Sequence, residues 1–168
     1  PISEIENELK SGTKLIRVMP NIAATVGEAS SAICPGENTT KEDVDVALEI
    51  FKTVGTARVV PEYLMDAFTG VSGSGPAFIF PVIEAMADGA VHEGLDRKNA
   101  LTFAAQTVLG AAKMVLDTEK HPAELKDMVT SPGGTTIRGV HELEEHGIRS
   151  AFMDAVIESS RRSKELGK

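Results

Sequence analysis

The residues best suited to bind a ligand or take part in a reaction form one short run, Ser131 to Thr136. In this run a serine and a proline precede two glycines and two threonines. Ser131 is a good helix N-cap and Pro132 suits the first helical position, so a helix is predicted to start here. The glycines leave the first amides uncovered, and Thr135 and Thr136 add hydroxyls beside them. Unpaired amides and the helix dipole favour a small anion, a carboxylate as readily as a phosphate. The alternative is a plain capped turn between two core helices.

A second glycine-rich run, Ser72 to Gly75, is followed directly by Pro76. It lacks the third glycine of a Gly-x-Gly-x-x-Gly nucleotide loop. It also does not match the Gly-x-Ser-x-Gly of a nucleophilic serine, because a helix rather than a strand leads into it. Glycines let two helices and a flat ligand come close together. We therefore expect this run to allow close approach and not to perform catalysis.

Histidine spacing argues against a metal site. His141 and His146 are five residues apart, so on an unbroken helix their imidazoles point about 140° apart and cannot share one ion. The acidic residues between them are expected to form a solvated helix face, and they are Glu142, Glu144 and Glu145. We predict no bound metal.

Bulk properties narrow the class of protein. The chain has 168 residues, 42% of them hydrophobic, and a net charge of −8, which argues against nucleic acid or an anionic membrane surface as a partner. No apolar run approaches the roughly 18 residues of a membrane span. The one cysteine, Cys34, excludes a disulfide framework and suits a reducing cytoplasm. Cys34 is expected to be a small core residue on a strand.

The first 60 residues predict an α/β pattern. A helix is expected over 3–9, with a capping box of Ser3 and Glu6 and an end at Gly12. Thr40 is expected to cap a helix that reaches about residue 53. Strands are expected over 15–19, 31–34 and 56–60. This order suits the end of a larger sheet, which would have an exposed edge without its other strands.

From residue 61 the pattern is helical, and no further strand is predicted. Pro81 should remove one hydrogen bond from its helix and bend the axis. The helix pair 77–90 and 100–115 is so apolar that burial on more than one side is expected, which indicates an intimate dimer. Helices are expected over 61–71, 76–94, 96–117, 122–129, 133–145 and 148–165, with a break at 72–75.

The amino-acid sequence around the first run is similar to that of a known family. Asp127 to Ile137, followed by Leu143 and Glu144, resembles the signature of pyrroline-5-carboxylate reductases, the enzymes that make proline. The resemblance covers nearly the whole chain in the family's order and spacing. Its other blocks are Arg17 to Asn21, Thr69 to Ala77, Gly110 to Met114, and His121 with Pro122.

The resemblance implies a fold and an activity. Residues 1–60 would be the α/β remnant of a Rossmann-type dinucleotide-binding domain. Residues 61–168 would be an all-α helical dimerisation and substrate domain, like the C-terminal domain of 6-phosphogluconate dehydrogenase. Such enzymes reduce 1-pyrroline-5-carboxylate to L-proline with NADPH or NADH, as homodimers or higher oligomers. The family's Gly-x-Gly-x-x-Gly loop is absent, so we expect a C-terminal fragment that is inactive alone.

The resemblance also implies roles for individual residues. Thr136 would be the catalytic residue, with its hydroxyl at the ring nitrogen of the substrate. The expected substrate-binding residues are Ser131, Gly134, Thr135, Thr136, Glu62 and Glu119. The expected cofactor-binding residues are Asn21, Ser74, Gly75, Pro76 and Met128.

The chain departs from the family pattern at Met128 and directly after Asn21. Met128 stands where the family usually has Asn or Gln, and Asn21-Ile-Ala23 replaces the usual Asn-Thr-Pro. Two alternatives remain open. One is a related reductase of another small keto or imino acid, and the other is a structural dimerisation module whose glycine loop binds nothing.

Overall fold

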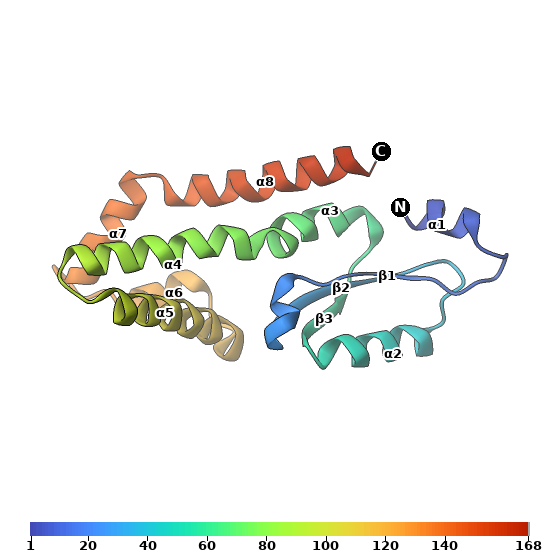
Figure 1. Ribbon diagram of the computed structural model, residues 1–168, viewed down its shortest axis with the longest axis horizontal. Coiled ribbons are helices and arrows are strands. Elements are labelled where there is room, and N and C mark those ends of the chain that lie inside the picture. Colours follow the sequence, from blue (N-terminus) through green and yellow to red (C-terminus); the bar gives the residue numbers. More distant parts are fainter. Residues whose placement is uncertain (168) are drawn as a thin grey trace. The chain divides into compact units, whose positions relative to one another are not determined.

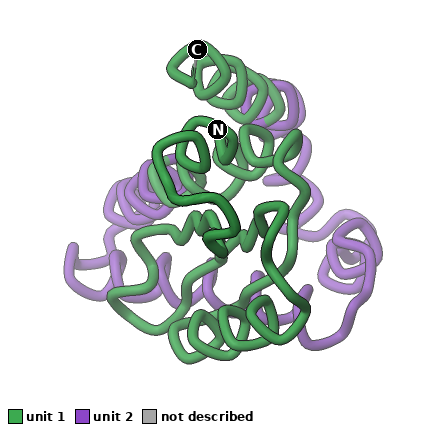
Figure 2. Tube along the Cα trace, turned by 90° about the vertical axis from the view of Figure 1, so that its right-hand side faces the viewer, with its two compact units in different colours: residues 1–77, 153–168 green, residues 78–152 purple. Residues whose placement is uncertain are grey.

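The computed structural model describes residues 1–167, which form three strands and a larger number of helices (Figure 1). The elements are α1 (Ile2–Glu8), β1 (Ile16–Met19), η1 (Ile22–Val26), β2 (Ala29–Pro35), α2 (Lys41–Lys52), β3 (Gly55–Val59), η2 (Glu62–Leu64), α3 (Met65–Phe68), η3 (Thr69–Gly73), α4 (Gly75–His92), α5 (Arg97–Thr118), α6 (Pro122–Met128), α7 (Thr135–Glu145) and α8 (Ile148–Leu166). They form two compact units (Figure 2), one of residues 1–77 with 153–167 and one of residues 78–152.

The first unit is built around a three-stranded sheet of order β1-β2-β3. β1 is antiparallel to β2, and β2 is parallel to β3, with α2 as the crossover between the parallel strands. The alternate residues Ala32 and Cys34 of β2 face a core that also contains Ile2 of α1 and Met65 of α3. Cys34 is thus the core residue on a strand that the sequence predicted. Burial raises the pKa of its thiol, and the nearby carboxylate of Glu62 raises it further.

The start of α2 confirms the predicted cap. The Thr40 hydroxyl accepts a hydrogen bond from the Asp43 amide (3.3 Å), and the Asp43 carboxylate accepts one from the Thr40 amide (2.9 Å). The Lys14 ammonium lies 2.7 Å from the same carboxylate. Lys14 and Thr40 together lower the pKa of Asp43 from its ordinary value of 3.8 to about 2.

The predicted capping box of α1 is wrong. The helix begins at Ile2, so Ser3 lies inside it, and no side chain caps its start. The Glu6 carboxylate instead accepts a hydrogen bond from the Glu37 amide at 3.2 Å, in the turn that follows β2. α1 ends at Glu8, four residues before Gly12. The Glu6 side chain, which the local pattern assigned to the cap, is therefore used in a contact with a residue distant in the sequence.

The predicted break at residues 72–75 is also wrong. Residues 62–92 form an almost continuous helical run that begins as a 3₁₀ turn and passes through the π turn η3 before α4. The Ser74 amide donates to the Thr69 carbonyl (2.9 Å), five residues back. Gly70 explains why the chain can pack there, since a Cβ at this position would lie 2.6 Å from the Val156 carbonyl oxygen of α8.

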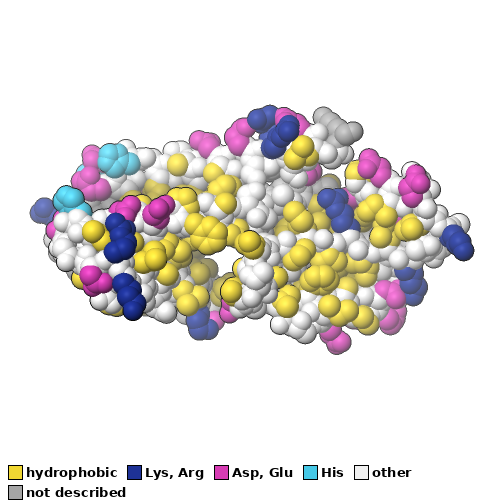
Figure 3. Space-filling model, viewed as in Figure 1, with side chains coloured by type: hydrophobic (Ala, Val, Ile, Leu, Met, Phe, Trp, Pro, Cys, Tyr) yellow, Lys and Arg dark blue, Asp and Glu magenta, His cyan; other side chains and the backbone are white. Residues whose placement is uncertain are grey.

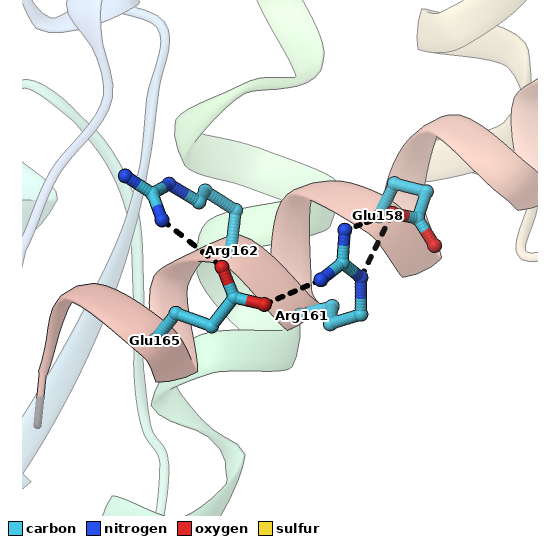
Figure 4. Close-up of polar contacts among 4 residues, drawn as sticks. All are labelled: Glu158, Arg161, Arg162 and Glu165. Carbon is cyan, nitrogen blue, oxygen red and sulfur yellow. Dashed lines mark hydrogen bonds and ion pairs between the residues drawn. The ribbon is translucent and has the colours of Figure 1, made fainter.

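Polar contacts hold the C-terminal part of α8 against this run. The hydroxyls of Ser74 and Ser159 are 2.5 Å apart, and the Ser163 hydroxyl donates to Asp66 at 2.6 Å. The solvent-facing side of the same helix carries ion pairs (Figure 4), in which Arg161 lies between Glu158 and Glu165. Exposed pairs of this kind contribute little to stability, because solvent screens them. The serine contacts therefore matter more for the position of α8.

The second unit has a small core and a large apolar surface. Its most buried residues are three alanines, Ala87, Ala100 and Ala104, against which Ile83 and Val91 pack. Large side chains on α4 and α5 are exposed, and Figure 3 shows apolar side chains gathered over these helices. They include Phe80, Met86, Leu101, Phe103, Leu109 and Leu116. Contiguous apolar surface of this kind marks an interaction site.

Most helices of the second unit begin where the sequence predicted. Asp96 caps α5 by accepting a hydrogen bond from the Asn99 amide at 3.0 Å, and Pro122 opens α6. Pro81 lies inside α4, and the predicted bend of that helix stays a prediction. Within the described residues, no helix combines the length and the apolar character that crossing a bilayer would require.

Candidate active site

The run from Ser131 to Thr136 forms a turn followed by a helix start. The Gly134 amide donates to the Ser131 carbonyl (3.0 Å), which closes the turn, and α7 begins at Thr135. The prediction that Ser131 caps a helix beginning at Pro132 is therefore wrong. Gly133 gives the reason, because its φ of +68° is left-handed and incompatible with a helix that runs through this position.

The two glycines are required for different reasons. Gly133 adopts a backbone conformation that other residues rarely take. Gly134 has an ordinary φ of −71°, but a Cβ there would lie 2.2 Å from the Ser131 hydroxyl oxygen and 3.2 Å from the Ser131 carbonyl oxygen. Ser131 therefore shapes the turn through contact with Gly134, and not through a helix cap.

The start of α7 has the donors that an anion needs. Gly134 occupies the N-cap position, and within the described residues no side-chain hydrogen bond caps this helix. The first amides of a helix have no carbonyl four residues behind them within the helix. Thr135 and Thr136, whose hydroxyls lie in this turn, are both exposed. The structure thus brings Ser131, Gly134, Thr135 and Thr136 together around uncapped amides.

The two acidic candidates have different surroundings. Glu62 lies in the first unit, where its Oε1 atom accepts hydrogen bonds from the Ile2 amide (2.6 Å) and the Arg17 guanidinium (3.3 Å). Glu119 lies in the second unit as the C-cap of α5, with a left-handed φ of +54° and its amide bonded to the Val115 carbonyl. Its side chain is exposed. The Glu62 carboxylate is thus hydrogen-bonded within the protein, whereas that of Glu119 is open to solvent.

Four of the cofactor candidates lie in the first unit. Asn21 caps η1 and reaches the glycine-rich run, where its side-chain nitrogen donates to the Ser72 carbonyl at 3.2 Å. Ser74 is bonded to Ser159, and α4 begins at Gly75 with Pro76 in its first turn. A Cβ at Gly75 would meet nothing within 4 Å, so the surface there is open.

The remaining cofactor candidate, Met128, is the last residue of α6 in the second unit and is 62% exposed. The Lys120 ammonium lies 3.9 Å from its sulfur and 2.6 Å from the Glu124 carboxylate. This thioether offers a weak acceptor where the family usually has an amide.

Two further features bear on the chemistry. Among residues 1–167, no three His, Cys, Asp or Glu side chains lie close enough to hold a metal ion, and His141 pairs with Glu145 at 3.5 Å. A hollow of about 380 Å³ lies along α7, lined by Ile137, Arg138, His141 and Glu142. None of the expected site residues lines it.

Sequence reasoning did not include Ser72 among the site residues. Its hydroxyl and carbonyl both contact Asn21, and the residue is only 8% exposed. A serine between glycines after a helix gave no local signal of this, because its partners lie 42 and 51 residues away in the sequence.

Comparison with known proteins identifies the family. The family model described as pyrroline-5-carboxylate reductase dimerisation matches residues 62–166. The chain therefore belongs to the pyrroline-5-carboxylate reductase family. The pyrroline-5-carboxylate reductase of Methanosarcina acetivorans is 73% identical over all 168 residues, which cover 62% of that relative. The chain thus spans about three-fifths of the length of this relative.

Solved structures agree with this assignment. A pyrroline-5-carboxylate reductase from Coxiella burnetii matches with a TM-score of 0.95 and 36% identity over 100% of this chain and 63% of its own. A Plasmodium falciparum pyrroline carboxylate reductase with NADP bound matches with a TM-score of 0.90 and 34% identity over 99% of this chain and 67% of its own. A mostly helical chain with a small sheet is what a Rossmann-type remnant followed by a helical domain requires.

Proposed function

We propose that this chain supplies the substrate-binding part of a pyrroline-5-carboxylate reductase that makes L-proline from 1-pyrroline-5-carboxylate. The observation that carries the proposal is the 73% identity along the entire chain to a relative of that name. The uncapped start of α7 supports it, because a carboxylate-bearing imino acid needs such donors.

In the proposed mechanism, the substrate carboxylate binds the amides at the start of α7. Charge-assisted hydrogen bonds to a carboxylate are about twice as strong as neutral ones, and the helix dipole adds to them. With the carboxylate held there, the Thr136 hydroxyl contacts the ring nitrogen, which gains a proton as its double bond to carbon is reduced. Ser131, Gly134 and Thr135 shape and complete the carboxylate site. Binding in one orientation supplies much of the rate.

The reduced nicotinamide, from NADPH or NADH, supplies the hydride when bound. We assign its contacts to Ser74, Gly75, Pro76 and Met128, whereas the side-chain nitrogen of Asn21, also an expected contact, donates to the Ser72 carbonyl. The open surface at Gly75 supports close approach of a flat ring. Met128 offers the ring packing in place of an amide hydrogen bond.

We also assign Glu62 and Glu119 to the amine side of the substrate. Both hydrogen bonds of Glu62 use Oε1, which leaves Oε2 for a cationic nitrogen. Glu119 is exposed at the end of α5 and can rotate toward a ligand. Their negative charge would favour the protonated product.

We infer that the domain boundary lies at residue 60, with a helical domain like that of 6-phosphogluconate dehydrogenase after it. The family match, which starts at residue 62, supports this boundary. The exposed apolar residues of α4 and α5 support a homodimer or higher oligomer. The net charge of −8 supports an enzyme without nucleic-acid or membrane partners, and the single cysteine supports a cytoplasmic location.

Turnover by the product of the complete gene tests the proposal. We expect oxidation of NADPH or NADH with 1-pyrroline-5-carboxylate, weaker turnover of a linear imine or keto acid, and no turnover by the 168-residue chain alone. Thr136→Ala should lower kcat/KM, whereas Thr102→Ala should not, since the Thr102 hydroxyl donates to the Lys98 carbonyl of its own helix. Preference for a linear substrate would favour the related reductase, and no turnover at all would favour a structural module.

A further inference from the structure

The side chain of Asn21 joins its own turn and the start of β2 to the glycine-rich run, which lies 51 residues further along the sequence. Its oxygen accepts hydrogen bonds from the amides of Ala23 (3.2 Å) and Ser30 (3.4 Å). Its nitrogen donates to the carbonyl (3.2 Å) and the hydroxyl (3.4 Å) of Ser72. An amide side chain has one oxygen and one nitrogen, and here both ends are used by the protein.

Ser72 continues the same set of contacts. Its hydroxyl donates to the Ser30 carbonyl at 3.3 Å, so Ser72 is bonded both to Asn21 and to the start of β2. Next to it, a Cβ at Gly73 would lie 3.5 Å from the terminal methyl of Met19 at the end of β1. The glycine-rich run is therefore packed directly on the ends of two strands.

These contacts fall within the π turn η3. A π turn contains one residue more than an α-helical turn, and its backbone hydrogen bonds alone favour it little, so tertiary contacts must stabilise it. On the α8 side, Gly70 packs on Val156 and Ser74 bonds to Ser159. On the sheet side, the side-chain amide of Asn21 makes the main polar contact. The extra residue sets the direction in which the helix leaves the turn.

We propose that Asn21 and Ser72 together position the run Ser72 to Gly75, so that Asn21 is a positioning residue and not a direct cofactor contact. The proposal rests on the proposed function, because it assumes that the nicotinamide lies against Ser74, Gly75 and Pro76. It replaces the assignment of Asn21 as a cofactor ligand with one in which Asn21 acts through the π turn.

Three variants in the product of the complete gene separate these roles. Asn21→Asp keeps an acceptor for Ala23 and Ser30 but loses the donor to Ser72, and its carboxylate faces the Ser72 carbonyl. Ser72→Ala keeps the bond from Asn21 to the backbone carbonyl. Asn21→Ala removes all four hydrogen bonds. Amide hydrogen exchange over residues 69–75 reports the π turn, and steady-state kinetics report the reaction.

The positioning role predicts a graded result. Asn21→Asp should speed amide exchange at 69–75 about tenfold and lower kcat by a similar factor, with the KM for pyrroline-5-carboxylate within about twofold of the wild type. Ser72→Ala should change both by about two- to threefold, and Asn21→Ala at least as much as Asn21→Asp. Exchange at the Ala23 amide should stay unchanged in Asn21→Asp.

Other results would overturn the proposal. A raised KM for the nucleotide with unchanged exchange in Asn21→Asp would mean a direct cofactor contact. A lowered melting temperature with unchanged kcat per folded enzyme would mean a purely structural role. A wild-type protein without reductase activity would overturn the proposed function, while the exchange data would still report whether Asn21 holds the π turn.

Discussion

The substitution Gly134→Ala tests the geometry of the turn before α7 most sharply. The new Cβ would lie 2.2 Å from the Ser131 hydroxyl oxygen, so that hydroxyl must rotate away, and 3.2 Å from the Ser131 carbonyl, which must move by a few tenths of an ångström. Alanine is also a poorer N-cap than glycine. We expect the free energy of unfolding to fall by about 1–2 kcal/mol.

Gly139→Ala is the matched control on the same helix. A Cβ at Gly139 meets nothing within 4 Å, so alanine should raise the free energy of unfolding by about 0.5–1 kcal/mol. The double variant Ser131→Ala with Gly134→Ala should recover part of the loss, because the closest contact is gone. Urea unfolding of the complete gene product measures all of these values.

Activity gives the second half of this prediction. Displacing one amide from the carboxylate removes a charge-assisted hydrogen bond worth about 1.5–3 kcal/mol, or about 12- to 160-fold in kcat/KM. Gly139→Ala should retain wild-type kcat/KM. Equal effects of Gly134→Ala and Gly139→Ala on stability and on turnover would refute the reasoning.

Three further predictions concern other parts of the chain. Asp43→Asn should lower the melting temperature by its full amount above about pH 4 and by less and less toward pH 2. The reason is that a carboxylate whose pKa is lowered by folding stabilises the protein only while it is ionised. A difference in melting temperature that stays constant with pH would contradict this. Phe103→Glu, at a side chain 56% exposed, should weaken self-association at least about tenfold by light scattering while Thr102→Glu does not, and an unchanged mass would rule out this face as the interface. Cys34 should react with a thiol reagent at pH 8 only after unfolding, and fast labelling of the folded protein would show that its burial is misassigned.

Local sequence signals predicted the elements whose caps are local. Thr40 and Asp96 each cap a helix where expected, because the amide that each side chain bonds lies three residues further on, and Pro122 takes the first position of α6 as expected. Predictions failed where a distant residue decided the structure. Glu6 bonds to Glu37 instead of capping α1, and Gly70 packs on α8 in a π turn where a break was expected.

In the candidate site, too, the features set by neighbouring residues could be predicted and those set by distant residues could not. The glycines and threonines before α7 were recognisable because bare amides need only a local run of residues. The start of α7 was misplaced because the left-handed φ of Gly133 cannot be read from the residues Ser131 and Pro132. The role of Ser72 could not be predicted, since it depends on hydrogen bonds to Asn21 and Ser30 across the fold.

A crystal structure of the complete gene product with L-proline and NADP⁺ tests the central claim most directly. Our account predicts the proline carboxylate within about 2.7–3.1 Å of the amides at the start of α7, with the ring nitrogen at the Thr136 hydroxyl. Proline bound elsewhere, with protein side chains filling the space in front of those amides, would contradict the account.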